Sequence, residues 1–342
     1  MGPAAPATAH IVGPVPVVAR AAALAGILAG LLLVAARFLP YVDVGGVAVT
    51  PGRGPLDVAA ALLWPGVVIA AGASVVLKRL PRLGLAVLAG SGALAIGLAV
   101  GELYQLQGAM AHRAVEVFFG QRLVTTSVDP LGGVWVHLAA YLLLVVALAL
   151  ILVGWPRTTM EDAGDFDAAR PLTMGLAAVA ALVGVLAVAA KPQAAPDRIV
   201  QDATGFRTTV EVAGEVSVLD RLGLDLAGGV LLAAAVCVVA LLAATLRPRL
   251  ASVGALGGLA SYFLSAALLL LLETGRYDDV VVAPGAVLHL LSGVAFAGLT
   301  AYCLLARRRP PVAPVRVPKR KQPIRSKAVP AGRVRPRRGA PR

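Results

Sequence analysis

Three pairs of ionisable residues recur at matching places in the two halves of this 342-residue chain: Asp57 and Asp225, Glu102 and Glu273, and His137 and His289. Two carboxylates and an imidazole on neighbouring helices could relay protons or hold a cation. The alternative interpretation is structural, because a carboxylate near a helix start stabilises that end and polar residues are typical of a membrane interface. The six residues are therefore a candidate polar site, and no residue is assigned as catalytic.

The composition is that of a membrane protein. Hydrophobic residues make up 58% of the chain and charged residues 14%, whereas soluble domains carry about 25% charged residues. The apolar residues are mostly Ala, Val, Leu and Gly, a bias that resembles actinobacterial proteins from GC-rich genomes. The net charge of +13 arises in residues 307–342, which contain 14 Lys and Arg and no Asp or Glu.

The hydropathy predicts an all-α integral membrane protein with eight transmembrane helices. A bilayer core of about 30 Å needs about 20 apolar residues of helix. Eight stretches are long and apolar enough, and we expect spans at 17–39, 57–77, 83–103, 133–154, 172–190, 226–246, 251–272 and 285–306. The chain then divides into a short N-terminus (1–16), a four-helix unit (17–154), a linker (155–171), a second four-helix unit (172–306) and a tail (307–342).

Basic residues beside the short loops predict the orientation. Lys78, Arg79 and Arg82 lie between the second and third spans, and Arg247 and Arg249 between the sixth and seventh. Such clusters are typical of the cytoplasmic side, so we expect both termini in the cytoplasm and the protein in the cytoplasmic (inner) membrane. The outer loops contain alternating stretches at 41–49 and 208–218, which predict short β-hairpins with turns at Gly45–Gly46 and Ala213–Gly214.

The two halves also share sequence. Residues 56–59 (LDVA) precede 224–227 (LDLA) by 168 positions, and Pro-Arg-Leu at 81–83 precedes the same tripeptide by 167. These matches predict two tandem four-helix repeats related by rotation about the membrane normal. Independent drift of Ala-rich helices could produce part of the similarity.

The tail is rich in Pro and Arg and has too few apolar residues to form a core, which predicts disorder. Its basic residues are expected to contact anionic lipids of the inner leaflet. The contact residues expected are Arg307, Arg308, Arg309, Lys319, Arg320 and Lys321. The prolines argue against a helix that reads nucleic-acid sequence, so no sequence-specific nucleic acid is expected as a partner.

The sequence contains no phosphate-binding loop, no His-Glu-x-x-His and no Gly-x-Ser-x-Gly motif. Cys237 and Cys303 lie in apolar spans and are expected to be free thiols, so no metal or cofactor is predicted. The leading hypothesis is a non-catalytic scaffold or accessory subunit of a membrane assembly in the cell envelope, with membrane-protein partners or further copies of itself. The alternatives are a transporter of an apolar or lipidic solute and a membrane-embedded enzyme that uses the outer Asp/Glu/His set.

Overall fold

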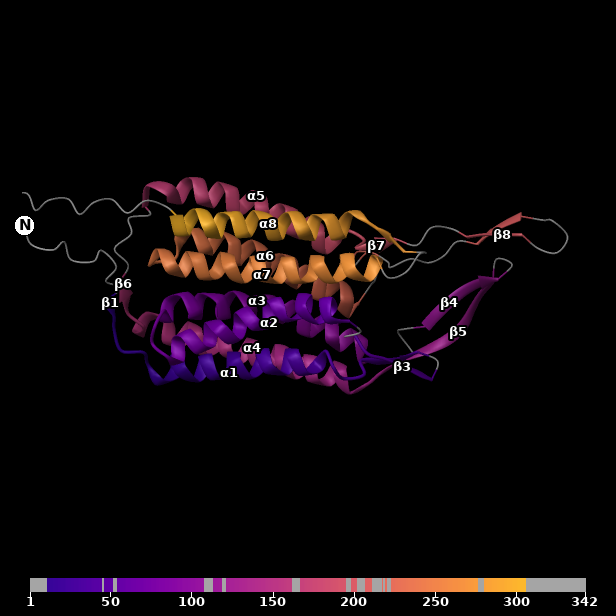
Figure 1. The fold of residues 1–342 in the computed structure, drawn as a ribbon, viewed down its shortest axis with the longest axis horizontal. Helices are drawn as coiled ribbons and strands as arrows, with labels where there is room; N and C mark the ends of the chain where they lie inside the picture. Colours follow the sequence, from indigo (N-terminus) through magenta and orange to yellow (C-terminus); the bar gives the residue numbers. More distant parts are fainter. Residues whose placement is uncertain are drawn as a thin grey trace, which may run out of the picture. The chain divides into compact units, whose positions relative to one another are not determined.

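The structure is a computed structural model that describes residues 11–305 except for 45, 52–53, 108–112, 119–120, 162–166, 195–197, 202–206, 211–216, 218, 220–222 and 276–279. Eight long apolar helices dominate it (Figure 1). They are α1 (Val17–Ala36), α2 (Pro55–Val76), α3 (Pro81–Gln105), α4 (Gly132–Gly154), α5 (Arg170–Ala189), α6 (Leu224–Thr245), α7 (Arg249–Thr274) and α8 (Pro284–Leu305). All eight expected spans are confirmed as helices of membrane-spanning length and hydropathy, and their ends differ from expectation by at most three residues.

Proline explains where several helices begin. α2 starts at Pro55, α3 at Pro81 and α8 at Pro284. Proline suits the first turn because the N–H that it lacks would have no partner inside the helix. These starts place Asp57 in the first turn of α2, as the start of α6 places Asp225 in its first turn.

The helices pack in the same pattern in each half of the bundle. In the first half α1 and α3 each pack against α2 and α4, and in the second half α5 and α7 each pack against α6 and α8. The halves meet where α3 packs against α6 and α7 and where α2 packs against α7. α3 is consequently the most enclosed of the eight helices, and two thirds of its most apolar stretch is buried.

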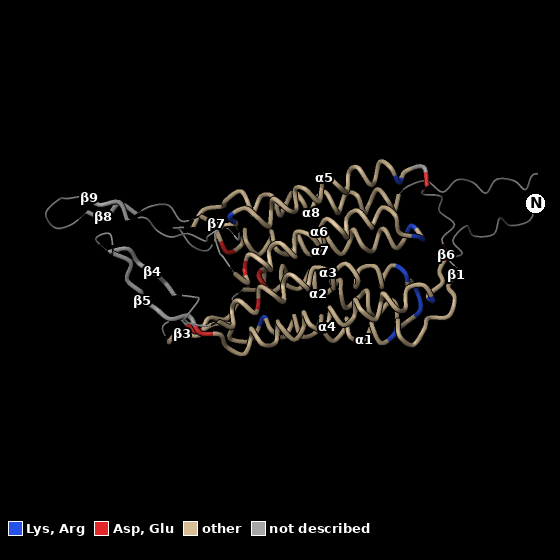
Figure 2. Tube along the Cα trace, turned by 180° about the vertical axis from the view of Figure 1, so that it is seen from behind, with Lys and Arg blue, Asp and Glu red and all other residues tan. Residues whose placement is uncertain are grey.

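Charged residues gather at the two ends of the bundle, with most of the basic ones at one end and most of the carboxylates at the other (Figure 2). At one end, called here the basic end, lie Lys78, Arg79, Arg82, Arg247 and Arg249. At the other, the carboxylate end, lie Asp57, Glu102, Asp225 and Glu273. Every Asp, Glu, Lys and Arg within the eight described helices lies within four residues of a helix end, which keeps charge away from the hydrocarbon centre.

Short strands extend from the carboxylate end. β2 (Val42–Val44) and β3 (Val47–Val49) form the antiparallel hairpin that the alternation over 41–49 predicts. Gly46 takes a positive φ of 88° in the turn and donates its N–H to Asp43 Oδ1 at 2.6 Å. β2 also pairs with β5 (Gln121–Pro130). β5 in turn pairs with the preceding strand, β4 (Arg113–Phe118), in a longer hairpin that the sequence did not predict.

The remaining strands form three two-stranded pairs. β1 (Ile11–Val12) pairs with β6 (Met160–Glu161), and β7 (Gln193–Ala194) pairs with β10 (Val281–Val282). β8 (Arg198–Gln201) pairs with β9 (Arg207–Val210), which lies at the start of the stretch for which a turn at Ala213–Gly214 is predicted. That predicted turn lies outside the described residues.

Glycines on α3 allow its backbone to touch three neighbouring helices. A Cβ at Gly84 would collide with the Ala71 carbonyl of α2, and one at Gly92 would lie 2.6 Å from the Leu144 carbonyl of α4. A Cβ at Gly97 would lie 2.5 Å from Leu232 N and 2.6 Å from Gly228 O on α6. In lipid, helices associate through such close packing, because no hydrophobic effect drives them together.

Replacing Gly97 by Ala is therefore expected to push α3 and α6 apart, at a cost of about 1–3 kcal/mol from overpacking. Gly298→Ala on α8 is the matched control, since a Cβ there meets no atom within 4 Å. The measurement is the melting temperature of the purified protein in a mild detergent. An equal melting temperature for the two variants would contradict this description of the α3–α6 contact.

Candidate functional site

A polar cluster forms at the carboxylate end from parts of the chain that are far apart in sequence. Glu102 lies in the last turn of α3, His137 in the second turn of α4, and Tyr41 five residues after the end of α1. The start of α4 is held against the segment after α1, because Leu131 N–H donates to Tyr41 O at 2.9 Å and Gly133 N–H to Pro40 O at 2.8 Å. These backbone bonds bring Tyr41 and His137 to the same end of the bundle.

Glu102 is the centre of this cluster, and each of its oxygens has a different neighbour. The Tyr41 hydroxyl donates to Glu102 Oε2 at 2.8 Å, while His137 Nδ1 lies 3.6 Å from Glu102 Oε1. The latter distance is too long for a direct hydrogen bond. His137 also stacks on Tyr141, with ring centroids 6.0 Å apart, and meets the edge of Tyr41 at 5.5 Å.

Tyr41 lies outside the spans but is largely enclosed. Burial and the nearby Glu102 carboxylate raise the pKa of the Tyr41 phenol well above its ordinary value. The phenol therefore stays protonated at physiological pH and remains a hydrogen-bond donor to Glu102. The pair is a stable arrangement for a carboxylate that is only 7% exposed.

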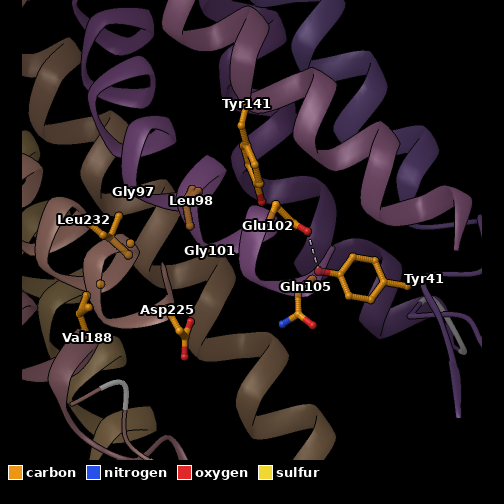
Figure 3. A pocket seen from close by; sticks show the side chains of 12 residues that line it. Tyr41, Gly97, Leu98, Gly101, Glu102, Gln105, Tyr141, Val188, Asp225 and Leu232 are labelled. Atoms are coloured by element: carbon orange, nitrogen blue, oxygen red, sulfur yellow. Dashed lines mark hydrogen bonds between the residues drawn. The ribbon is translucent and has the colours of Figure 1, made fainter. Parts of the chain in front are cut away.

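A first cavity of about 220 Å³ opens between α3 and α6 (Figure 3). Its polar lining consists of Glu102, Gln105, Asp225, Tyr41 and Tyr141. No Lys or Arg is among the described residues that line it, so the cavity carries only carboxylate charge. Its volume is below the 300–1,000 Å³ that is usual for drug-sized ligands.

A second cavity of about 150 Å³ lies between α2 and α7 and is also lined by residues of α1 and α4. Its polar lining differs from that of the first and consists of Arg37, His137, Tyr141, Tyr262, Trp64 and Ser265. The indole N–H of Trp64 already donates to Ser91 Oγ at 3.2 Å, and Tyr262 packs edge-on against the Trp64 ring. Tyr141 lines both cavities and stands beside His137 between them.

The predicted site residues converge in the first half but not in the second. Glu102 and His137 lie together and are both buried, and Asp57 is 7% exposed at the start of α2.

In the second half Glu273 is exposed at the end of α7. The Nδ1 atom of His289 contacts Gly285 O at 2.8 Å within its own helix. Asp225 joins Glu102 in the first cavity, although the two residues come from different halves of the chain.

Tyr41, Tyr141 and Arg37 contribute to the cluster and were missed by the sequence analysis. Tyr141 had a detectable signal, since it lies four residues after His137 and therefore on the same face of a helix. Tyr41 had none, because it follows a span and precedes a strand, and only the tertiary fold brings it to Glu102.

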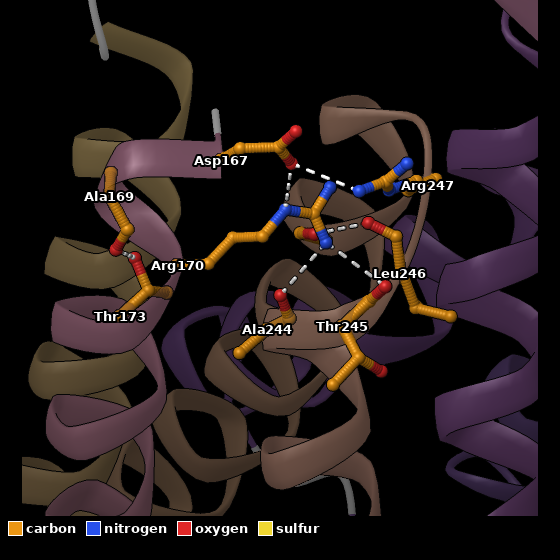
Figure 4. A network of polar contacts seen from close by, with 9 residues as sticks. Asp167, Ala169, Arg170, Thr173, Ala244, Thr245, Leu246 and Arg247 are labelled. Atoms are coloured by element: carbon orange, nitrogen blue, oxygen red, sulfur yellow. Dashed lines mark hydrogen bonds and ion pairs between the residues drawn. The ribbon is translucent and has the colours of Figure 1, made fainter. Parts of the chain in front are cut away.

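A second polar network lies at the basic end (Figure 4). Asp167 accepts hydrogen bonds from Arg170 Nε at 2.6 Å and from Arg247 at 3.3 Å. Arg170 also donates to the carbonyl oxygens of Ala244 and Thr245, at 3.4 and 3.1 Å. A cation on the last carbonyls of α6 stabilises the negative end of that helix, so this network ties the linker to α6 and is structural.

Other expectations concern metals, thiols and the tail. Cys237 and Cys303 are free. No group of three or more His, Cys, Asp and Glu residues that could hold a metal ion occurs within the described residues. The six tail residues expected to contact lipid, from Arg307 to Lys321, lie outside the described part of the chain.

Comparison of the chain with protein families, curated proteins and solved structures found no match. The class of the protein therefore follows from its own helices. Eight apolar helices of spanning length make it a polytopic membrane protein in contact with the lipid bilayer.

The Tyr41–Glu102 bond predicts the effect of Tyr41→Phe. Loss of the donor leaves a buried carboxylate oxygen without its partner, which is expected to cost about 1–3 kcal/mol and to lower the melting temperature. Tyr302→Phe is the matched control, because Tyr302 is 39% exposed on α8. If both variants melt with the wild type, the bond to Glu102 does not stabilise the fold.

Proposed function

We propose that the protein is a two-repeat membrane scaffold or accessory subunit of an assembly in the cell envelope, and that it catalyses no reaction. The first support is the repeat itself. Helix packing in the first half is reproduced in the second, with α5 to α8 in the roles of α1 to α4. The contact of α3 with α6 then has its counterpart in the contact of α7 with α2, as a two-fold axis through the α3–α7 interface requires.

Strand pairing supports the repeat at the level of single residues. β2 pairs with β5 so that Val42 lies opposite Pro130, and β7 pairs with β10 so that Gln193 lies opposite Val282. Each residue of the second pair follows its counterpart by 151 or 152 positions. The same separations relate the bond from Gly133 N to Pro40 O with the bond from Gly285 N to Lys191 O.

The cavities support the repeat as well. Positions 168 residues apart line the two cavities: Ala61 and Gly229, Trp64 and Leu232, Gly97 and Ser265, Leu98 and Ala266, and Gly101 and Leu269. At the helix crossing itself, Gly97 lies against Gly228 O, and Ser265 Oγ donates to Ala60 O at 2.7 Å. This separation of 168 is the one that the LDVA and LDLA segments give.

The observation that carries the scaffold proposal is the placement of charge and open space. Charged residues of the described helices lie at the helix ends, and where the second cavity reaches Pro65 and Tyr262, at the middle of α2 and α7, none of its lining residues is charged. Proton-coupled transporters and ion pumps use ionisable residues near the membrane centre, which argues against the transport alternative. The small cavities and the close packing of apolar helices suit a scaffold, which binds its partners on its outer surface.

One observation favours the enzyme alternative, namely the convergence of Glu102 and His137 at 3.6 Å beside an open cavity. A carboxylate and an imidazole at this distance could exchange a proton directly after a small side-chain shift that brings them within hydrogen-bond distance. Against it, His289, the equivalent of His137, contacts a carbonyl of its own helix, and the separation of 168 places Leu270 rather than a glutamate at the position of Glu102. The same residues therefore do not recur as a catalytic pair in the second repeat.

The orientation we propose has both termini in the cytoplasm of the inner membrane, with the carboxylate end outside. Arg82 and Arg249 follow the same short links in the two repeats, which supports one cytoplasmic face for both clusters. In this orientation the tail, with Arg307 to Arg309 next to α8, would meet anionic lipid.

Cytoplasmic reporters fused after Arg82, after Arg249 and to the tail are expected to be active, and a reporter fused in the β4–β5 hairpin is expected to be inactive. The measurement is reporter activity normalised to membrane abundance. A periplasmic result at any of the three basic positions would contradict the orientation.

Complementation separates the scaffold from the enzyme. In a strain that lacks the protein, Glu102→Gln and His137→Gln are expected to restore the growth or envelope phenotype whenever their membrane abundance equals that of the wild type. His289→Gln serves as the matched control from the second repeat. Loss of complementation by Glu102→Gln and His137→Gln at normal abundance, with the control intact, would overturn the non-catalytic proposal.

A further inference from the structure

The cavity between α2 and α7 combines a cationic side with an apolar side. Arg37 and His137 line it together with the hydroxyl-bearing Tyr141 and Tyr262. The rest of the lining is largely apolar and includes Leu33, Pro65, Ala266 and Leu269. Among the described residues that line the cavity there is no Asp or Glu, so its only full charge is that of the Arg37 guanidinium.

His137 carries an unused hydrogen-bonding group at this cavity. Its side chain is nine-tenths buried, and its Nδ1 makes no hydrogen bond within the described part of the chain. Nδ1 faces Glu102 Oε1 at 3.6 Å, which leaves the other ring nitrogen, Nε2, for the cavity. In the tautomer that carries its proton on Nε2, that nitrogen can donate a hydrogen bond to a ligand in the cavity.

We propose that this cavity binds the anionic head of a single-chain amphiphile, a carboxylate or phosphate held by Arg37 and His137. The guanidinium offers several N–H donors to an oxyanion, and the Nε2–H group of His137 adds one more. The volume of about 150 Å³ accommodates the head and the first methylene groups along Leu33 and Leu269. The rest of the alkyl chain would extend into the bilayer.

Two neighbouring carboxylates limit the charge of the ligand. The negative charges of Asp57 and Glu273 act on Arg37 and offset part of its positive potential. A ligand with one or two negative charges in direct contact with the guanidinium is still attracted to it, whereas a larger polyanion would be repelled by the two carboxylates. A headgroup of the fatty-acid or lipid-phosphate type fits this requirement.

The equivalent cavity between α3 and α6 supplies an internal comparison. Val188 occupies there the position that corresponds to Arg37, and Glu102 and Asp225 line the space. An anion is excluded from that cavity by charge, so one ligand per chain is expected. This inference goes beyond the scaffold proposal and does not depend on it, because a bound amphiphile is compatible with a scaffold or an enzyme.

The test uses the purified full-length chain in a neutral maltoside detergent and titration calorimetry. The probes are dodecanoate, dodecyl phosphate, dodecanol and inorganic phosphate. Dodecanoate or dodecyl phosphate is expected to bind at one site per chain, and the tighter of the two identifies a carboxylate or a phosphate headgroup. Equal binding of dodecanol would overturn the anionic site, and equal binding of inorganic phosphate would overturn the amphiphile.

Variants assign the site. Arg37→Gln is expected to weaken binding of the preferred probe at least about tenfold, and His137→Gln to weaken it to a smaller extent. Arg20→Gln, near the opposite end of α1, is the matched control and should keep wild-type affinity. Melting temperatures without the probe show whether each variant is folded. Wild-type affinity in folded Arg37→Gln and His137→Gln would overturn the proposal, and if Arg37→Gln does not fold, His137→Gln decides it.

Discussion

Close approach of α3 to its neighbours is the constraint on which the rest of the bundle depends. Lipid offers no hydrophobic drive for helix association, so the helices are held by packing at short range. Glycines at 84, 92 and 97 remove the side chains that would keep α2, α4 and α6 away, and Gly254 of α7 does the same against Leu83 of α3. α3 thereby joins both halves of the chain, and the two cavities flank its contacts and those of α7.

The order and extent of the spans could be predicted from the sequence because bilayer thickness and charge are local constraints. A run of apolar residues between Pro55 and Lys78, for example, has few alternatives to one spanning helix. The hairpin at 41–49 was predictable for a similar reason, since alternation and a glycine turn are both local signals. The β4–β5 hairpin was missed, and so was its pairing with β2, which joins segments about 85 residues apart.

The polar cluster could be predicted only in part from local sequence signals. Matched spacing identified Glu102 and His137, and the structure brings them together. The same reasoning gave Glu273 and His289 an equal role, but Glu273 is exposed and His289 contacts the carbonyl four residues before it. Equal depth in sequence does not determine which way a side chain faces, and Tyr41, which bonds Glu102, belongs to no helix at all.

The strands at the carboxylate end have a mechanical consequence. A single residue, Leu131, separates the end of β5 from the start of α4, and its N–H is bonded to the segment that leaves α1. This short connection and this bond couple the direction of β5 to that of the first turn of α4. A force on the β2–β5 pair would therefore act on the start of α4, close to His137, where α4 packs against α1.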